Sequence, residues 1–311
     1  MIEPSNPPTV GPDGRPATTI RRPGPGDLDR LGEFVEAARG RHDFEPSSDP
    51  EASFLVEYAR STPDAVAVAL APDDSVVGLI SPEFKTIVVA PAWRRRGVGG
   101  ALVEAGLAIE RDRGRAELIL GLTPEDSGGR SFLTATGFGY HSTLFELALP
   151  TGAASPPPKW PAAVVARPFD RDRDVAPFLE TFNTAFAEHA TPLQMTEAGL
   201  RASFDDPRLR DEDVLVLEAA GGELVGLCAT VPARASGIEG HDDVGLIGVL
   251  PAWRGRGLGR QLLAWAVAYL RGLGAGDVWL GVNERNDGAL RLYESAGFER
   301  RTTRERWARA A

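Results

Sequence analysis

The hydrophobic residues of this chain follow two spacings, one typical of strands and the other of helices. Short apolar runs at 118–122, 244–249 and 278–282 predict buried strands. Apolar residues three and four positions apart predict amphipathic helices, as at 28–39 and 258–270. Strands and helices alternate along the chain, which predicts an α/β fold of the α+β, mixed-sheet kind.

One stretch joins a predicted strand to a predicted helix through a loop of Arg and Gly. The apolar run ends at Pro251, and the helical pattern begins at Leu258. Glycines let the loop backbone turn tightly and bring its N–H groups close to a ligand, and a helix start adds unpaired N–H groups and partial positive charge. The stretch therefore predicts a phosphate or pyrophosphate site. Its candidate residues are Val249, Leu250, Arg254, Gly255, Arg256, Gly257, Leu258, Gly259 and Arg260.

The same stretch occurs 160 residues earlier in the chain. The offset holds from the loop to a closing Gly-Phe pair, at Gly137-Phe138 and Gly297-Phe298. Upstream the offset falls to 148, so the second copy carries twelve more residues at about 232–243. A repeat of this length indicates two similar domains. The first copy contributes Val89, Arg94, Arg95, Arg96, Gly97, Val98 and Gly99 as candidate binding residues.

Composition marks the domain boundaries. Residues 1–17 are rich in Pro and Gly and predict a disordered tail. Residues 150–161 are rich in Pro and predict a semi-rigid linker. We therefore expect an N-terminal domain at 18–149 and a C-terminal domain at 162–311.

These residues support a family resemblance. The patterns Arg254-x-x-Gly257-x-Gly259 and Arg94-x-x-Gly97-x-Gly99 resemble the pyrophosphate-binding motif of the GNAT acyltransferase superfamily. The segment from Asn286 through Tyr293 to Phe298 is similar to the closing helix of that family. The resemblance implies two tandem GNAT domains, each with a sheet whose central strands part to admit acetyl-CoA. The implied reaction is N-acetyl transfer from acetyl-CoA to an amine.

The resemblance also implies roles for single residues. Tyr293 matches the family tyrosine that protonates the CoA sulfur, and Asn286 matches a residue that contacts pantetheine or organises the loop. A backbone N–H near Val249 or Leu250 would stabilise the thioester oxygen. For the base, a strand period of two places Asp243 on the face of Val249.

The assignment of the base leaves alternatives open. A carboxylate at Asp243 would accept the amine proton through a water molecule. His241 is a second candidate, because its reference pKa is closer to neutral. Asp242-Asp243 is equally consistent with a solvated hairpin turn.

The first copy departs from the pattern at the catalytic positions. Leu133 stands where the second copy has Tyr293, and Asp126 stands where it has Asn286. Glu83 aligns with Asp243, so one base candidate remains. Since leucine has no proton to donate, we expect catalysis in the C-terminal domain and a weak or inactive N-terminal domain that can still hold CoA.

Charge and composition narrow the partners. The net charge of −10 argues against a nucleic-acid binder. No stretch has the length of a membrane span, and the single cysteine, Cys228, fits a reducing cytoplasm. We expect a cytoplasmic enzyme that uses no metal and acts on a small-molecule amine, as a monomer (a pseudo-dimer of its two copies) or as a homodimer.

Three further hypotheses concern the activity. Chain length, the stretch 182–187 and the placement of Asp243 and Tyr293 are similar to the mycothiol synthase group of two-domain GNAT proteins. The second hypothesis is a non-catalytic acyl-CoA sensor, which would also need both loops. The third hypothesis is a GNAT-like enzyme that transfers a different acyl group.

Overall fold

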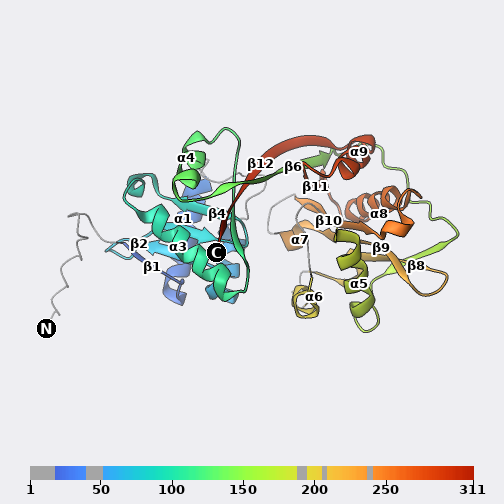
Figure 1. Ribbon diagram of the computed structural model, residues 1–311, viewed down its shortest axis with the longest axis horizontal. Helices are drawn as coiled ribbons and strands as arrows, with labels where there is room; N and C mark the ends of the chain where they lie inside the picture. Colours follow the sequence, from blue (N-terminus) through green and yellow to red (C-terminus); the bar gives the residue numbers. More distant parts are fainter. Residues whose placement is uncertain (1–17, 40–51, 188–194, 205–208, 237–240) are drawn as a thin grey trace. The chain divides into compact units, whose positions relative to one another are not determined.

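The computed structural model describes residues 18–39, 52–187, 195–204, 209–236 and 241–311. The predicted tail at 1–17 lies outside the described residues. The chain divides into two compact units (Figure 1). Unit 1 consists of Met1–Ser142 and Glu305–Ala311, and unit 2 of Thr143–Arg304.

Unit 1 alternates strands and helices as the hydrophobic pattern predicts. Its elements are β1 (Thr19–Arg21), α1 (Leu28–Arg39), α2 (Ala52–Ser61), β2 (Ala67–Leu70), β3 (Val76–Ser81), β4 (Thr86–Val89), α3 (Val98–Asp112), β5 (Glu117–Leu122), α4 (Ser127–Ala135) and the start of β6 (Gly139–Leu149).

In unit 1 the first four strands form an antiparallel sheet in the order β1-β2-β3-β4. Side chains alternate between its faces, so Val68 packs against α1 and α2 while Ala69 packs against α3. Next to this sheet, Gly121 N of β5 donates a backbone hydrogen bond to O of Lys85, the residue before β4, at 2.8 Å.

Unit 2 repeats this order after the Pro-rich segment. Its elements are β7 (Val164–Pro168), α5 (Val175–Phe186), α6 (Glu197–Phe204), β8 (Val214–Ala219), β9 (Leu224–Val231), α7 (Ala233–Ser236), β10 (Asp242–Val249), α8 (Leu258–Gly272), β11 (Val278–Asn283), α9 (Asp287–Ser295) and β12 (Glu299–Ala310), of which the last residues belong to unit 1.

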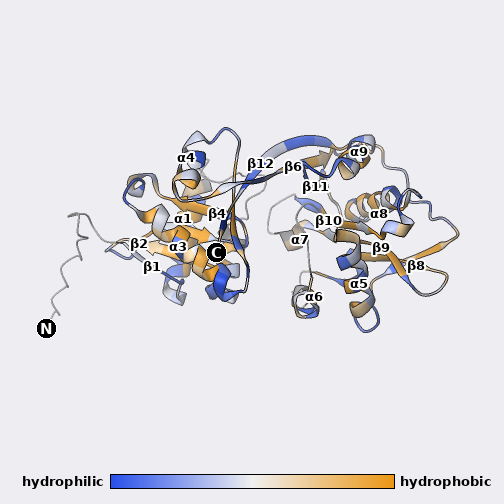
Figure 2. Ribbon diagram, in the orientation of Figure 1, coloured by the Kyte–Doolittle hydropathy of each residue, from blue (hydrophilic) through white to orange (hydrophobic). Residues whose placement is uncertain are grey.

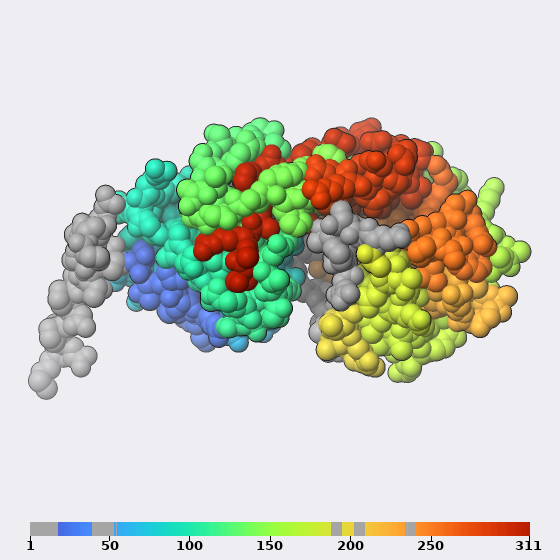
Figure 3. Space-filling model, in the orientation of Figure 1, coloured from blue at the N-terminus to red at the C-terminus, as the bar shows by residue number. Residues whose placement is uncertain are grey.

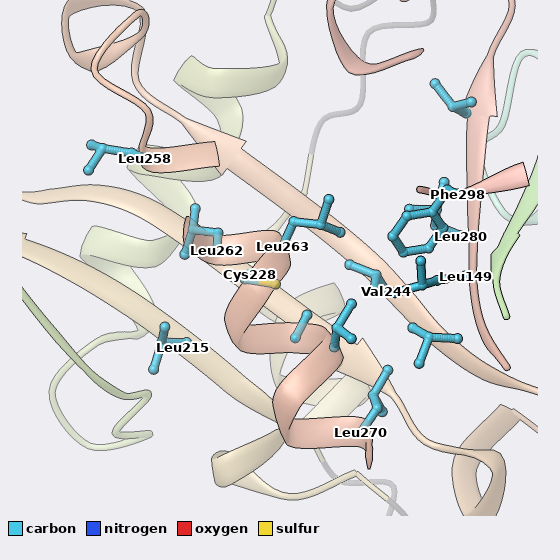
Figure 4. Close-up of a cluster of buried hydrophobic side chains, with 14 of the residues drawn as sticks. Leu149, Leu215, Cys228, Val244, Leu258, Leu262, Leu263, Leu270, Leu280 and Phe298 are labelled. Carbon is cyan, nitrogen blue, oxygen red and sulfur yellow. The ribbon is translucent and has the colours of Figure 1, made fainter. Parts of the chain in front are cut away.

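The sheet of unit 2 runs β6-β11-β10-β9-β8-β7, and only the central pair, β10 and β11, is parallel. Helix α8 covers one face, here called the α8 face, over a core that includes Leu262, Cys228 and Leu280 (Figure 4). Helices α5 and α6 cover the other face, here called the α5 face, where Phe182 and Leu200 are buried. Because both faces are covered, β8 and β9 are apolar along most of their length (Figure 2).

The segment predicted as a linker is attached to unit 2 rather than free. The Arg271 guanidinium donates hydrogen bonds to Ala153 O at 2.6 Å and Pro150 O at 3.1 Å. Thr151 donates to Asp277 Oδ1 through its N–H and its hydroxyl, both at 2.8 Å, and these bonds lower the pKa of Asp277. The segment is therefore held along the end of α8.

The two copies exchange their last strands. Residues 144–149 of β6 pair with β11 of unit 2, and residues 305–310 of β12 pair with β5 of unit 1, both antiparallel. Leu147 lies opposite Leu280 and Trp307 opposite Leu120, so the two pairings are themselves related by the 160-residue offset. Figure 3 shows the C-terminal residues, in red, against the surface of unit 1. The compact units thus differ from the predicted boundaries at 149 and 162 by one exchanged strand each.

We expect removal of residues 305–311 to destabilise unit 1, because β5 would lose its strand partner. The deletion also removes the Arg130–Glu305 ion pair at 2.9 Å and the edge-to-face contact of Trp307 with Tyr140. The milder Trp307→Ala change should lower the free energy of unfolding by about 2 kcal/mol, below the value for a fully buried tryptophan. Denaturant unfolding followed by circular dichroism measures this.

Trp307→Phe is the matched control, since it keeps an aromatic ring opposite Leu120 and should cost less than about 1 kcal/mol. Full stability of the deletion variant would contradict the exchanged pairing.

Candidate active site

The Arg/Gly loop joins β10 to α8 as predicted. A single 3-10 turn at Pro251–Trp253 starts it, and Gly255 and Gly257 then adopt left-handed φ angles of 77° and 79°. Gly257 is the N-cap of α8 and supplies no side-chain cap. The first intrahelical bond runs from Gln261 N to Gly257 O at 3.3 Å, so the N–H groups before it have no intrahelical acceptor. This is the local geometry that an anionic ligand needs.

The side chains of the loop arginines are held by contacts with other residues of unit 2. Arg254 donates to Val249 O at 3.2 Å and to Ala185 O at 3.0 Å, which ties the end of β10 to α5. Arg256 lies 4.6 Å from the ring centre of Trp253, and Arg260 donates to Ser295 Oγ at 2.6 Å. The positive charge is therefore fixed around the start of α8.

Strands β10 and β11 pair at only two positions. Asp242 lies beside Val278 and Asp243 beside Trp279. In the described chain, β11 forms no further pair with β10, although β10 continues to Val249 and stays paired with β9 along its other edge. The central strands of unit 2 therefore part, as the GNAT resemblance implies.

A bulge in β10 changes which residues share a face. The register against β9 shifts between Val244 and Leu246, so Gly245 is the extra residue. Val244, Ile247 and Val249 pack on the α8 face, while Leu246 packs on the α5 face.

Because of this bulge, the prediction that Asp243 shares a face with Val249 is wrong. Asp243 pairs with Val231 and Val249 with Gly226, five residues apart on β9, so the two residues face opposite sides of the sheet. Asp243 therefore lies on the α5 face. Asp242 and Asp243 are also strand residues, which excludes the hairpin-turn alternative.

The strand end offers one of the two predicted oxyanion donors. Leu250 N donates to Val225 O at 3.0 Å and Leu250 O accepts from Trp253 N at 2.8 Å, so both backbone groups of Leu250 are engaged and its proposed donor role is wrong. N–H groups alternate between the two edges of a strand. The N–H groups of Val249 and Ile247 therefore point to the edge of β10 from which β11 has parted.

His241 and Asp243 form a hydrogen-bonded pair. His241 Nδ1 lies 2.7 Å from Asp243 Oδ2, and the imidazole stacks on the Trp279 ring with centroids 4.5 Å apart. His241 is 7% exposed. The neighbouring Asp242 has a separate role, because its Oδ1 accepts a hydrogen bond from Ala233 N at 2.9 Å.

Tyr293 lies on the α8 face. Its ring packs against the α8 core and lies 6.1 Å from Phe298. Burial, and then the nearby Cys228, raise the pKa of Tyr293 to about 12. Cys228 is a fully buried free thiol whose pKa burial also raises, as expected for a small core residue.

Asn286 begins α9 as its N-cap, with its side-chain oxygen accepting Ala289 N at 3.1 Å. Asp126 of unit 1 caps α4 in the same way, accepting Gly129 N at 2.7 Å. Both residues at this position thus organise the start of the closing helix.

The loop of unit 1 has the same shape. Gly97 has a φ of 86°, and Arg95 adopts a φ of 61° where unit 2 has Gly255. Arg94 donates to Val89 O at 2.9 Å, which reproduces the contact of Arg254, and Arg96 lies over the Trp93 ring. The start of α3 therefore offers the same backbone arrangement as the start of α8.

The catalytic positions of unit 1 are built differently. Leu133 is buried, and Glu83 lies in the turn that precedes β4. The Glu83 carboxylate pairs with Arg113 at 3.4 Å and with Arg115 at 3.2 Å. Glu83 is thus neutralised by two guanidinium groups, unlike Asp243.

Sequence reasoning missed Trp279, which stacks on His241, and the bulge at Gly245. A Cβ atom at Gly245 would come within 2.9 Å of the Val231 side chain, so a larger residue there would have to displace that side chain. An isolated glycine within a strand pattern was the available signal for a bulge.

Comparison with known proteins identifies the family. A model described as the acetyltransferase (GNAT) family matches residues 177–298, which include β10, the loop and α9. A mycothiol acetyltransferase of Thermobispora bispora is 31% identical over 286 residues, covering 89% of this chain and 94% of that protein. The chain belongs to the GNAT acetyltransferase family. It is an acetyl-transferring enzyme.

Other GNAT relatives agree with this assignment. A mycothiol acetyltransferase of Thermomonospora curvata is 34% identical over 220 residues, 69% of each chain. Two solved structures share the fold over 94% of this chain: a GCN5-related N-acetyltransferase from Sphaerobacter thermophilus (TM-score 0.70, 22% identity, 95% of that chain) and a tandem GNAT protein from the clavulanic acid biosynthesis pathway (TM-score 0.68, 19% identity, 98% of that chain). The fold is therefore that of a tandem GNAT protein.

Among the described residues, no group of three or more His, Cys, Asp or Glu side chains is arranged to hold a metal ion. No helix within the described ranges is long and apolar enough to cross a membrane.

We expect Gly257→Ala to weaken acetyl-CoA binding. An added methyl group meets nothing within 4 Å, so the cost is the strain of a left-handed φ, about 1 kcal/mol. Relief of that strain would rotate the loop N–H groups away from the ligand and raise the KM for acetyl-CoA, which steady-state kinetics measures.

Gly97→Ala is the matched control in unit 1, since Gly97 has a similar φ and equally open surroundings. It should cost the same stability and leave turnover unchanged. Equal kinetic effects from both variants would contradict the placement of catalysis in unit 2.

Proposed function

We propose that this GNAT protein transfers an acetyl group from acetyl-CoA to the amine of a small molecule, and that catalysis takes place in unit 2. The observation that carries the proposal is the placement of Tyr293 and Asp243 on opposite faces of the sheet where β10 and β11 part. An acid and a base on opposite sides of a thioester suit acyl transfer to an amine.

Backbone groups would hold most of the acetyl-CoA. The N–H groups of Leu258, Gly259 and Arg260 at the start of α8 suit the pyrophosphate. The unpartnered edge of β10 suits the amide groups of pantetheine, which would hydrogen-bond to it as an added strand does. Bound acetyl-CoA supplies the reactive thioester.

The remaining chemistry belongs to side chains and one backbone donor. The N–H of Val249 or Ile247 would stabilise negative charge on the thioester oxygen. Tyr293, which its raised pKa keeps protonated at neutral pH, would donate a proton to the departing sulfur. The His241–Asp243 pair on the α5 face would take up the proton of the amine.

Unit 1 has a supporting role in this proposal. Its loop keeps the geometry of an acetyl-CoA site, while Leu133 and the ion-paired Glu83 leave no acid and no free base at the catalytic positions. We therefore assign to unit 1 binding of CoA without turnover.

The relatives favour one acceptor among small amines. Proteins named mycothiol acetyltransferase recur among the similar chains at 31–34% identity, and one aligns over nearly its full length. The amine that becomes mycothiol on acetylation is therefore the first acceptor to test. A non-catalytic acyl-CoA sensor is the alternative.

Incubation with acetyl-CoA, the amine precursor of mycothiol and a panel of unrelated small amines tests the activity. We expect an acetylated product, seen by mass spectrometry as a gain of one acetyl group, together with release of CoA. Tight acetyl-CoA binding with no product from any amine would overturn the proposal in favour of the sensor.

Replacement of Tyr293 by Phe should lower kcat about 100-fold with little change in the KM for acetyl-CoA, because the ring is kept and only the proton donor is lost. Since the pKa of Tyr293 is about 12, the wild-type kcat should show no loss with a midpoint near pH 10.

Tyr269→Phe serves as the matched control for this substitution. The Tyr269 hydroxyl donates to the buried Asp213 at 2.8 Å, so its loss should reduce stability by about 1–3 kcal/mol and leave kcat intact. Undiminished turnover in the Tyr293→Phe variant would contradict the role of Tyr293 as the proton donor to the departing sulfur.

A further inference from the structure

One nitrogen in the candidate active site of unit 2 has no hydrogen-bond partner among the described residues. His241 Nε2 is buried and forms no hydrogen bond with any described residue, while the other ring nitrogen is 2.7 Å from Asp243 Oδ2. Leaving a buried polar atom without a partner carries a free-energy cost, so such an atom in a folded protein calls for an explanation. A ligand that bonds to Nε2 would supply one.

The hydrogen bond to Asp243 determines which nitrogen is basic. A carboxylate only accepts hydrogen bonds, so Nδ1 must carry the ring proton. In the neutral imidazole the lone pair then lies on Nε2. The pair therefore presents a proton acceptor at Nε2, the atom that no described residue hydrogen-bonds.

Two groups lie against the imidazole of His241. The Asp243 carboxylate carries the charge opposite to that of an imidazolium, and the face of Trp279 attracts a cation stacked on it. Strand β10, which begins directly after His241, contributes Asp243 and Asp242, the latter already bonded to Ala233 N, and β11 contributes the non-titrating Trp279.

The position of the pair fits proton uptake from an acceptor amine. Asp243 and Trp279 are the last paired residues before β10 and β11 part, so His241 is anchored to both strands at that point. Through the bulge at Gly245, Asp243 faces the α5 side, opposite Tyr293 and the α8 core. Acid and base are thus separated by the sheet itself.

We propose that His241, through Nε2, is the group that accepts the amine proton, and that Asp243 is a positioning residue that fixes the imidazole. The proposal rests on the acetyltransferase function proposed above for unit 2. The amine nitrogen bonds to the thioester carbonyl carbon, and its proton passes to His241 Nε2. The C–S bond breaks with its electron pair on sulfur, which takes a proton from Tyr293. His241 then releases its proton to water, and Tyr293 regains one.

Four single variants of the full chain test the assignment. His241→Gln and Asp243→Asn remove the base and its carboxylate partner. Asp242→Asn is the control for the neighbouring carboxylate, since its amide oxygen still accepts from Ala233 N. His141→Gln is the histidine control, because His141 contacts Ser142 in unit 1.

The measurement is the pH profile of kcat/KM with the amine that proves active. His241→Gln should lower kcat about 100-fold and abolish the acid limb of the profile. In Asp243→Asn, the imidazole loses the carboxylate that fixes it, so kcat should fall about tenfold while an acid limb remains. Both controls should keep the wild-type profile.

Nitrogen-15 NMR of the histidine rings gives a readout that does not depend on turnover. The chain has four histidines, and the His241 signal is the one absent from His241→Gln. We expect the tautomer with the proton on Nδ1 in the wild type and in Asp242→Asn.

The possible outcomes separate the two proposals. Near-normal turnover and an unchanged acid limb in His241→Gln, with activity lost in Asp243→Asn, would make Asp243 the base and overturn this inference while the enzyme function stands. Absence of product from the wild type would overturn the proposed function itself. A proton on Nε2 would exclude His241 as the acceptor in either case.

Discussion

The short parallel pairing of β10 and β11 is the constraint on which the site of unit 2 depends. Two paired positions hold the strands together at Asp242 and Asp243, and the bulge that follows turns β10 away. A longer pairing would use the backbone groups of β10 within the sheet. Because the observed pairing ends early, it leaves N–H and C=O groups along one edge of β10, a central strand that is otherwise covered on both faces. Such an edge is a ready partner for an extended, amide-bearing ligand.

The same bulge divides the chemistry between the two sides of the sheet. One extra residue in β10 reverses the direction of every side chain before it relative to those after it. Asp243 therefore faces α5 while Val249 faces α8. Unit 1 has a turn with Lys85 at a φ of 55° at the corresponding place, and β4 begins only after it. The two copies share the Arg/Gly loop but have different backbones at the position of this bulge.

Much of this arrangement was predictable because it depends on local patterns. Strand and helix positions follow apolar periodicity, and the anion loop follows from glycines at left-handed positions, Gly255 and Gly257. Arg95 has the same conformation without being glycine, so the loop shape is imposed by its flanks as well as by residue type. The constant 160-residue offset also implies that the helices after the two loops have the same length, and α3 and α8 both have fifteen residues.

What escaped prediction depends on contacts distant in sequence. Trp279 lies 38 positions after His241, and nothing in either local pattern indicates that their rings stack. The bulge was not predicted because regular alternation of side chains between the two faces was assumed to continue through Gly245. The exchanged strands were missed because β6 and β12 have the same pattern, and periodicity identifies a strand but not its partner.

The exchange of β6 and β12 has a consequence for how the protein is made. The partner of β5 is synthesised more than 180 residues after β5 itself, since Leu122 pairs with Glu305. At ribosomal rates of about 5–20 residues per second, this separation corresponds to roughly 10–40 s. During that interval the nascent chain carries an incomplete sheet edge, the kind of surface that chaperones cover. Residues 305–311 therefore complete unit 1 long after the rest of that unit has been synthesised.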